Sequence, residues 1–123
     1  MDDLAGLRAL VVEDEASVAL LIEDWLAALG CEIAASVASL RRACECAAST
    51  PCDFAVLDVN LAGELVFPAA RILVSRSVPF LFATGYGASG IDPEFGRHPI
   101  VTKPFTALAL RAGIVAALAL PGK

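Results

Sequence analysis

The sequence has little positive charge and few aromatic side chains for its 123 residues. It contains two lysines, one histidine, one tryptophan and one tyrosine. Charged residues make up only 19% of the chain, whereas hydrophobic residues reach 58%, so the chain has too much apolar surface to remain disordered. Nine lysines and arginines against fourteen aspartates and glutamates leave a net charge of −5. This balance argues against nucleic acid or an anionic membrane as the main partner.

Long hydrophobic runs and an export signal are missing as well. The longest apolar stretch, from Ala112 to Leu120, is far shorter than the roughly 18–20 residues of a spanning helix. The first three residues are Met, Asp and Asp, where a signal peptide would be basic. We therefore expect a cytoplasmic protein without a membrane partner. The length fits a single domain over residues 1–123.

The four cysteines carry no metal or disulfide pattern. Cys44 and Cys46 are too close together for a zinc-type pair, and the only histidine, His98, is far away in sequence. No export signal points to an oxidising compartment. We interpret Cys31, Cys44, Cys46 and Cys52 as free thiols that behave as small hydrophobic side chains.

Short apolar runs alternate with helical patterns along the chain. Strands are predicted at Arg8–Val12, Cys31–Ala35, Asp53–Leu57, Val78–Ala83 and Ile100–Thr102. Helices are predicted at Glu15–Leu29, from Ser36 or Ser39 to Ser49, at Leu65–Ser75 and at Thr106–Leu120. This alternation predicts an α/β fold, a doubly wound five-stranded parallel sheet with helices on both faces. Leu108, Leu110 and Leu118 of the last helix either pair with a partner or pack on the sheet, and we expect packing on the sheet.

Residues 85–96 break the alternation. Four glycines and one proline make this segment a poor helix, since each interior glycine costs about 1 kcal/mol relative to alanine. We expect a loop or one short helical turn, so that the fourth helix is weak or missing. The segment is either a plain connector or a part of low local stability that can switch conformation.

Polar residues follow four of the five predicted strands, at the carboxyl edge where open parallel sheets bind ligands. They are Glu13, Asp14 and Glu15 after the first strand, Asp58 after the third, Thr84 after the fourth and Lys103 after the fifth. Clustered carboxylates suit Mg²⁺, and a carboxylate can also attack phosphorus. Lysine and threonine can hold phosphate oxygens. The pattern indicates phosphoryl chemistry, although Glu15 is explained equally well by charge compensation at a helix N-terminus.

These segments, in this order, resemble the receiver domain of two-component response regulators. The matching stretches are Val11–Glu15, Phe54–Asp58, Ala83–Thr84 and Lys103–Phe105, and the resemblance covers essentially the whole chain. It implies a flavodoxin-like sheet with strand order 2-1-3-4-5. It also implies a signalling phosphoacceptor rather than an enzyme, with only self-catalysed phosphotransfer and dephosphorylation.

The resemblance assigns a role to each residue of the predicted site. Asp58 is implied to be the phosphoacceptor, and Thr84 and Lys103 are implied to contact the phosphoryl group. Glu13, Asp14, Asp58 and the backbone carbonyl of Asn60 are implied to hold Mg²⁺, with Mn²⁺ as an alternative ion. The peptide bond before Pro104 is implied to be cis.

A narrower resemblance lies in Pro79–Gly87, which is similar to the signature of the FATGUY response regulators. These are largely single-domain receivers of alphaproteobacteria. The resemblance implies phosphorylation by a histidine kinase, often of the HWE or HisKA2 type, or by a phosphotransfer protein. Without an output domain, the protein is expected to act on an unknown downstream protein by contact, or as a phosphate sink.

The switch residue of ordinary receivers is replaced in this chain. Ile100 stands where they carry tyrosine or phenylalanine, so the usual coupling to Thr84 cannot operate. Tyr86, flanked by Gly85 and Gly87, is a candidate substitute, or else an ordinary loop aromatic.

Three alternatives remain beside a stand-alone receiver. The first is a receiver domain of a hybrid histidine kinase. The second is a phosphatase-type enzyme with an aspartyl nucleophile, but haloacid-dehalogenase-like enzymes usually have a second aspartate where this chain has Asn60. The third is a non-phosphorylated pseudo-receiver that only binds partners, whose usual mark is the loss of an acidic or phosphoacceptor residue. No such residue is lost here.

Overall fold

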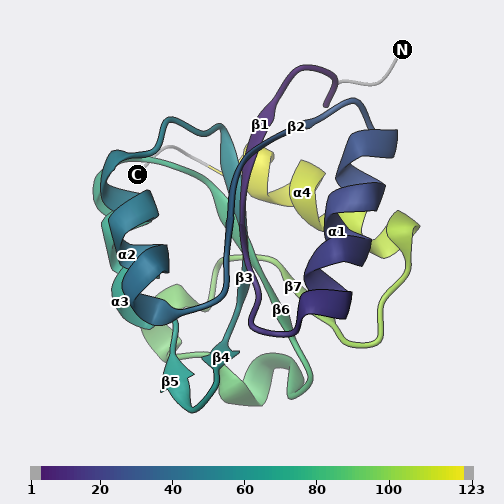
Figure 1. Cartoon of the computed structure of the whole chain (residues 1–123). Helices are drawn as coiled ribbons and strands as arrows, with labels where there is room; N and C mark the ends of the chain where they lie inside the picture. Colours follow the sequence, from purple (N-terminus) through teal and green to yellow (C-terminus); the bar gives the residue numbers. More distant parts are fainter. Residues whose placement is uncertain (1–3, 121–123) are drawn as a thin grey trace.

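A computed structural model describes residues 4–120 of the chain, and its centre is a five-stranded parallel sheet (Figure 1). The strands are β1 (Arg8–Val12), β2 (Glu32–Val37), β3 (Phe54–Asp58), β6 (Phe80–Thr84) and β7 (Ile100–Thr102). Their spatial order is β2-β1-β3-β6-β7. Because β6 and β7 are the fourth and fifth strands of this sheet, the predicted order 2-1-3-4-5 is confirmed.

Two helices cover each face of the sheet (Figure 1). One face is covered by α1 (Ala16–Ala28) and α4 (Ala107–Ala119), the other by α2 (Leu40–Ser49) and α3 (Phe67–Ser75). Neighbouring residues of a strand alternate between the two faces, so Val11 packs beneath α1 while Val12 packs on the opposite side. This explains why the strands read as continuous apolar runs in the sequence.

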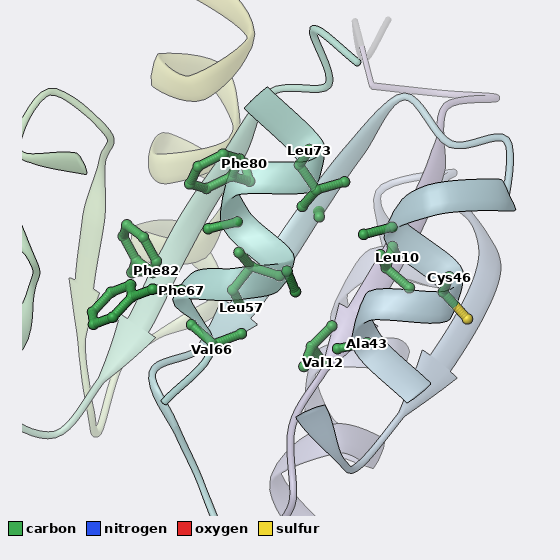
Figure 2. Packing of buried hydrophobic residues seen from close by; sticks show 14 of the residues in the cluster. Leu10, Val12, Ala43, Cys46, Leu57, Val66, Phe67, Leu73, Phe80 and Phe82 are labelled. Carbon is green, nitrogen blue, oxygen red and sulfur yellow. The ribbon is translucent and has the colours of Figure 1, made fainter. Parts of the chain in front are cut away.

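Aromatic rings fill much of the core between the sheet and α3. Figure 2 shows Phe67 of α3 beside Phe82 of β6, and their ring centroids lie 6.0 Å apart in an edge-to-face arrangement. Phe80 and Phe82 are fully buried. Burial of each such side chain contributes about 1.5–3 kcal/mol to stability.

Hydroxyl side chains fix where two of the helices begin. The Ser39 hydroxyl accepts a hydrogen bond from the Arg42 amide, so Ser39 rather than Ser36 caps α2. Thr106 caps α4 in the same way, by accepting from the Ala109 amide at 3.0 Å. Each of these caps satisfies one amide that the first helical turn leaves unpaired.

A small antiparallel hairpin follows β3, where the sequence was expected to form a loop and then a helix from Leu65. It consists of β4 (Asn60–Leu61) and β5 (Glu64–Leu65). Ala62 and Gly63 connect them with φ angles of +54° and +95°, the left-handed backbone of a tight hairpin turn. The prediction of helix at Leu65 is therefore wrong, and α3 begins two residues later.

The segment from Gly85 to Pro99 contains no α-helix, as expected from its glycines. Two single-turn 3-10 helices occur instead, η1 (Gly87–Gly90) and η2 (Pro93–Phe95). Phe95 is 1% exposed and stacks on Phe67 at a centroid distance of 5.5 Å. Phe95 anchors this segment to the core together with His98, whose ring stacks on Phe80 at a centroid distance of 4.0 Å.

The leucines of the last helix differ in burial. Leu110 is buried and Leu118 packs against the core, but Leu108 is 77% exposed, so its predicted packing on the sheet is wrong. None of the helices within residues 4–120 has the length and apolar character needed to cross a membrane. All four cysteines are free thiols, two of them buried and two half-buried.

Candidate functional site

The carboxyl ends of four strands bring the predicted site residues together. Glu13 and Asp14 follow β1 directly, and Asp58 is the last residue of β3. Parallel pairing places Val12 beside Leu57, so these acids meet at the same edge of the sheet. One carboxylate oxygen from each of Glu13, Asp14 and Asp58 lies within 4.8 Å of the other two. The predicted acidic cluster is therefore present.

Lys103 extends into this cluster from the end of β7. Its Nζ atom lies 2.8 Å from Glu13 Oε1 and 3.5 Å from Asp58 Oδ1. Burial alone would lower the pKa of Lys103, but its hydrogen bond to Glu13 and the charge of Asp58 raise the pKa above its usual value. The ammonium group is therefore held in its charged form between two carboxylates.

Three carboxylates around a single lysine leave an excess of negative charge. Burial raises the pKa of Asp58 to about 7, and the charge of Glu13 and hydrogen bonding with Asp14 act in the same direction against the Lys103 charge. Burial would also raise the pKa of Asp14, but hydrogen bonds from Asp58 and the Ala62 amide lower it overall. The repulsion between the three carboxylates therefore disfavours the ionised form of Asp58 in particular.

The donor set fits Mg²⁺. Three carboxylates supply the hard oxygen ligands that this ion prefers, and the half-buried Asp14 leaves the cluster accessible from solvent. The high pKa of Asp58 marks a charge imbalance that a divalent cation would relieve. The Asn60 side chain accepts a hydrogen bond from the Gly63 amide at 2.7 Å, and the assignment of its backbone carbonyl to the ion stays a prediction.

Sequence reasoning missed one element that contacts the site. The Ala62 amide, at the tip of the β4–β5 hairpin, donates to Asp14 Oδ2 at 3.0 Å. This bond ties the hairpin to the acidic cluster. Gly63, next to Ala62 and between two short pairs of strand residues, was the available signal for a hairpin turn, because glycine readily adopts the left-handed backbone of such turns.

Thr84 links the site to the glycine-rich segment. It is the last residue of β6 and is 1% exposed, and its hydroxyl accepts a hydrogen bond from the Tyr86 amide at 3.1 Å. The Tyr86 side chain itself is 67% exposed. Gly87 adopts a φ of +59°, which favours glycine at that position, whereas a Cβ atom at Gly85 would meet no other atom within 4 Å.

The end of β7 places the two remaining predicted residues. Ile100 is partly buried against the aromatic core and has no hydroxyl with which to act as a tyrosine would. The peptide bond between Lys103 and Pro104 is cis. The backbone amide of Lys103 donates to the Thr84 carbonyl at 2.8 Å, so β6 and β7 hold Thr84 and Lys103 in fixed relation.

Comparison with known proteins identifies relatives of this fold and site. The chain is similar to SdrG from Sphingomonas melonis Fr1, with 35% identity and a TM-score of 0.83 over 93% of this chain and 98% of SdrG. The BeF3-activated conformation of SdrG from Pseudomonas melonis Fr1 is 34% identical, with a TM-score of 0.78 over 94% of this chain and 98% of that one. The receiver domain of the response regulator PhyR from Erythrobacter litoralis is 28% identical, with a TM-score of 0.78 over 95% of both chains.

The fold and the carboxyl-edge cluster define a receiver domain. The chain belongs to the family of response-regulator receiver domains. No protein-family model and no curated protein sequence matches it.

Proposed function

We propose that the protein accepts a phosphoryl group on Asp58 from a phosphohistidine of a histidine kinase or phosphotransfer protein. The observation that carries this proposal is the meeting of three carboxylates, a buried threonine and a lysine at one edge of the sheet. An Asp58 oxygen would form the new P–O bond while the P–N bond to the donor histidine breaks, with the electron pair leaving on that nitrogen. The protein is then a phosphoacceptor in signalling rather than an enzyme with a separate substrate.

The side chains around Asp58 suit this transfer. Lys103 Nζ lies 3.5 Å from Asp58 Oδ1, close enough to hold a phosphoryl oxygen attached there. The Thr84 hydroxyl can donate to a second phosphoryl oxygen once it turns from the loop toward the site. A Mg²⁺ ion held by Glu13, Asp14, Asp58 and the Asn60 carbonyl would supply the positive charge that keeps Asp58 ionised and stabilises the transferred group, with Mn²⁺ as an alternative.

This protein offers the phosphoryl donor an apolar docking surface beside the site. An apolar groove of about 370 Å³ is lined by residues of α1 and by Lys103–Phe105 after β7. Its walls include Trp25 and Phe105, whose rings pack at a centroid distance of 5.8 Å. Because Lys103 lines both the groove and the phosphorylation site, a helix of the donor lying in the groove would present its histidine near Asp58.

The signal would leave through the segment after β6. If the Thr84 hydroxyl turned to donate to a phosphoryl group on Asp58, its hydrogen bond from the Tyr86 amide would break and the start of this segment would be released. Tyr86, together with Gly85 and Gly87, is the proposed switch, since Ile100 cannot replace the tyrosine of ordinary receivers.

We further propose a stand-alone, cytoplasmic regulator of the FATGUY type. The basis of this proposal is the similarity to SdrG, of which this chain covers 98%. Such a protein would receive its phosphoryl group from an HWE- or HisKA2-type kinase. It would then act on an unknown downstream protein by contact or serve as a phosphate sink.

Phosphotransfer from an autophosphorylated kinase of this type tests the proposal. With Mg²⁺ present, we expect a retarded band in phosphate-affinity electrophoresis that is absent for Asp58→Asn. Asp24→Asn, which removes an exposed carboxylate far from the cluster, should behave like the unmodified protein. Transfer to the Asp58→Asn variant would refute the assignment of the phosphoacceptor.

A further inference from the structure

A second polar pocket lies at the amino ends of β1, β3 and β6, on the edge of the sheet opposite Asp58. Its volume is about 460 Å³. The side chains that give it chemical character are Arg8, Cys52, Asp53, Arg76 and Ser77. The proposed phosphotransfer uses none of them.

The two arginines of this pocket have no carboxylate partner within residues 4–120. Asp53 lies in the same pocket, but its Oδ2 accepts from the Arg8 backbone amide at 2.8 Å rather than from a guanidinium group. The Arg76 guanidinium donates only to the neutral carbonyls of Ala47 and Thr50, at the end of α2. By contrast, Arg42 and Arg71 form ion pairs with glutamates at 2.6 and 2.8 Å. The pocket is therefore lined by two guanidinium groups and one carboxylate, a local excess of positive charge in a protein of net charge −5.

Arg8 and Arg76 line one pocket together with the half-buried Cys52. Burial raises the pKa of the Cys52 thiol, the charge of Arg76 acts against that rise, and the nearby charges of Asp53 and Arg8 oppose each other. Arg76 is also held in place by the two carbonyls at the end of α2. Because its side chain is already ordered, binding of an anion would cost less conformational entropy.

Ser77 adds a free hydroxyl on a strained backbone. Its φ angle is +58°, in the left-handed region that costs a residue with a side chain roughly 1 kcal/mol relative to glycine. The conformation closes α3, because the Ser77 amide donates to Val74 O and the Val78 amide to Leu73 O. The Ser77 hydroxyl has no hydrogen-bond partner in the described part of the chain. A position suited to glycine thus carries a hydroxyl in the pocket that Arg8 and Arg76 also line.

We propose that this pocket binds a phosphate group, either as free phosphate or as the end of a small phosphate monoester. The Arg8 guanidinium group comes from the start of β1, whereas the Arg76 guanidinium group and the Ser77 hydroxyl come from two neighbouring residues after α3. Such an arrangement suits the three terminal oxygens of a tetrahedral anion better than the two of a carboxylate. Asp53 lowers the net positive charge of the pocket, and Arg76 is already bonded to carbonyls at the end of α2. The affinity for phosphate should therefore depend strongly on Arg8, which has no such role at α2.

Amide NMR with inorganic phosphate tests this proposal, in EDTA and at constant ionic strength set with chloride. We expect saturable shifts at the Cys52, Asp53 and Ser77 amides and at the Arg8 Nε–H group. Arg8→Gln should weaken binding about tenfold, the loss of one charge-assisted contact. Arg97→Gln, the same change at an exposed arginine elsewhere, should leave binding unchanged. Ser77→Gly suits the left-handed backbone and should weaken binding severalfold in a folded protein.

The source of the phosphate group is distinguished by a parallel titration with phenyl phosphate. Tighter binding of phenyl phosphate indicates a monoester ligand, and equal or weaker binding indicates free phosphate. Linear shifts that chloride alone reproduces, or equal losses in Arg8→Gln and Arg97→Gln, would overturn the proposal. Because no Mg²⁺ or kinase is present, failure here leaves phosphorylation of Asp58 untouched, and the reverse also holds.

Discussion

Asp58 combines a buried position with a charge that the protein alone does not fully compensate. Its pKa is raised from 3.8 to about 7 by burial and by Glu13. A carboxyl whose pKa is raised on folding stabilises the folded state while it stays neutral, below the unfolded pKa. That stability is lost as the pH rises from about 4 through about 7.

Replacing Asp58 with asparagine should therefore stabilise the metal-free protein at high pH. At pH 8 we expect Asp58→Asn to raise the free energy of unfolding by about 1–2 kcal/mol, a value reduced for solvent screening at the rim of the site. Near pH 4 the difference should vanish. Urea denaturation in EDTA across this range measures it, with Asp24→Asn as control. An equal difference at both pH values would show that Asp58 is not the titrating group.

Mg²⁺ binding should be coupled to the same proton. Because Asp58 must ionise to bind the cation, the apparent Mg²⁺ affinity should fall toward tenfold per pH unit below about pH 7. The shift in melting temperature with Mg²⁺ concentration, measured at pH 6 and pH 8, gives both affinities. Equal affinities at the two pH values would contradict the charge balance derived for this cluster.

Gly113 sets how closely α4 approaches the sheet. A Cβ atom at this position would lie 2.9 Å from Leu81 Cδ1 and 3.0 Å from Val101 Cγ2, and both side chains are buried. Replacing a glycine such as Gly113 by alanine inside a helix normally raises the free energy of unfolding by about 1 kcal/mol. Overpacking of a core lowers the free energy of unfolding by about 1–3 kcal/mol. We expect a net loss of about 1 kcal/mol in thermal or urea unfolding, and a gain in stability would contradict this packing.

At the level of elements, the sequence was most informative where burial is two-sided. The strand cores around Val11, Val56 and Leu81 were predicted because both faces of the sheet are covered, which gives unbroken apolar runs. The β4–β5 hairpin was missed because its strands have two residues each, too few to show an alternating pattern. The exposure of Leu108 was missed because α4 is apolar on all sides, so its pattern does not show which side faces the sheet.

The segment from Gly85 to Pro99 has two parts with different stability. Its second part is held by Phe95 and by Arg71 of α3, which pairs with Glu94 at 2.8 Å. We expect Phe95→Ala to destabilise the protein by about 3–4 kcal/mol, whereas Phe105→Ala, at a partly exposed ring, should cost clearly less. Urea denaturation compares the two. Similar losses would mean that Phe95 is not the anchor.

The first part of this segment is the part expected to respond to phosphorylation. Within residues 4–120, the hydrogen bonds that restrain the backbone around Tyr86 are those of the Thr84 and Ser89 hydroxyls and of the short η1 turn. With beryllofluoride and Mg²⁺, amide NMR shifts should concentrate between Thr84 and Gly96, and most strongly before Phe95. Changes confined to the α2 side of the sheet would contradict the proposed output.

On the scale of the whole molecule, the sheet separates two edges of opposite character. The carboxyl edge gathers Glu13, Asp14 and Asp58, while the amino edge presents Arg8 and Arg76. The carboxyl-edge residues could be predicted because strand order brings the ends of separate strands together. The amino-edge pocket could not, because it depends on which arginines lack carboxylate partners, and only the folded structure shows that.

The most direct test of the central claim is phosphorylation by a small-molecule phosphodonor, followed by mass spectrometry of the intact protein. With acetyl phosphate and Mg²⁺, we predict the gain of one phosphoryl group by the unmodified protein and by Asp24→Asn. No gain is predicted in EDTA or for Asp58→Asn. A phosphoryl group on Asp58→Asn, or none on the unmodified protein with Mg²⁺, would contradict the account.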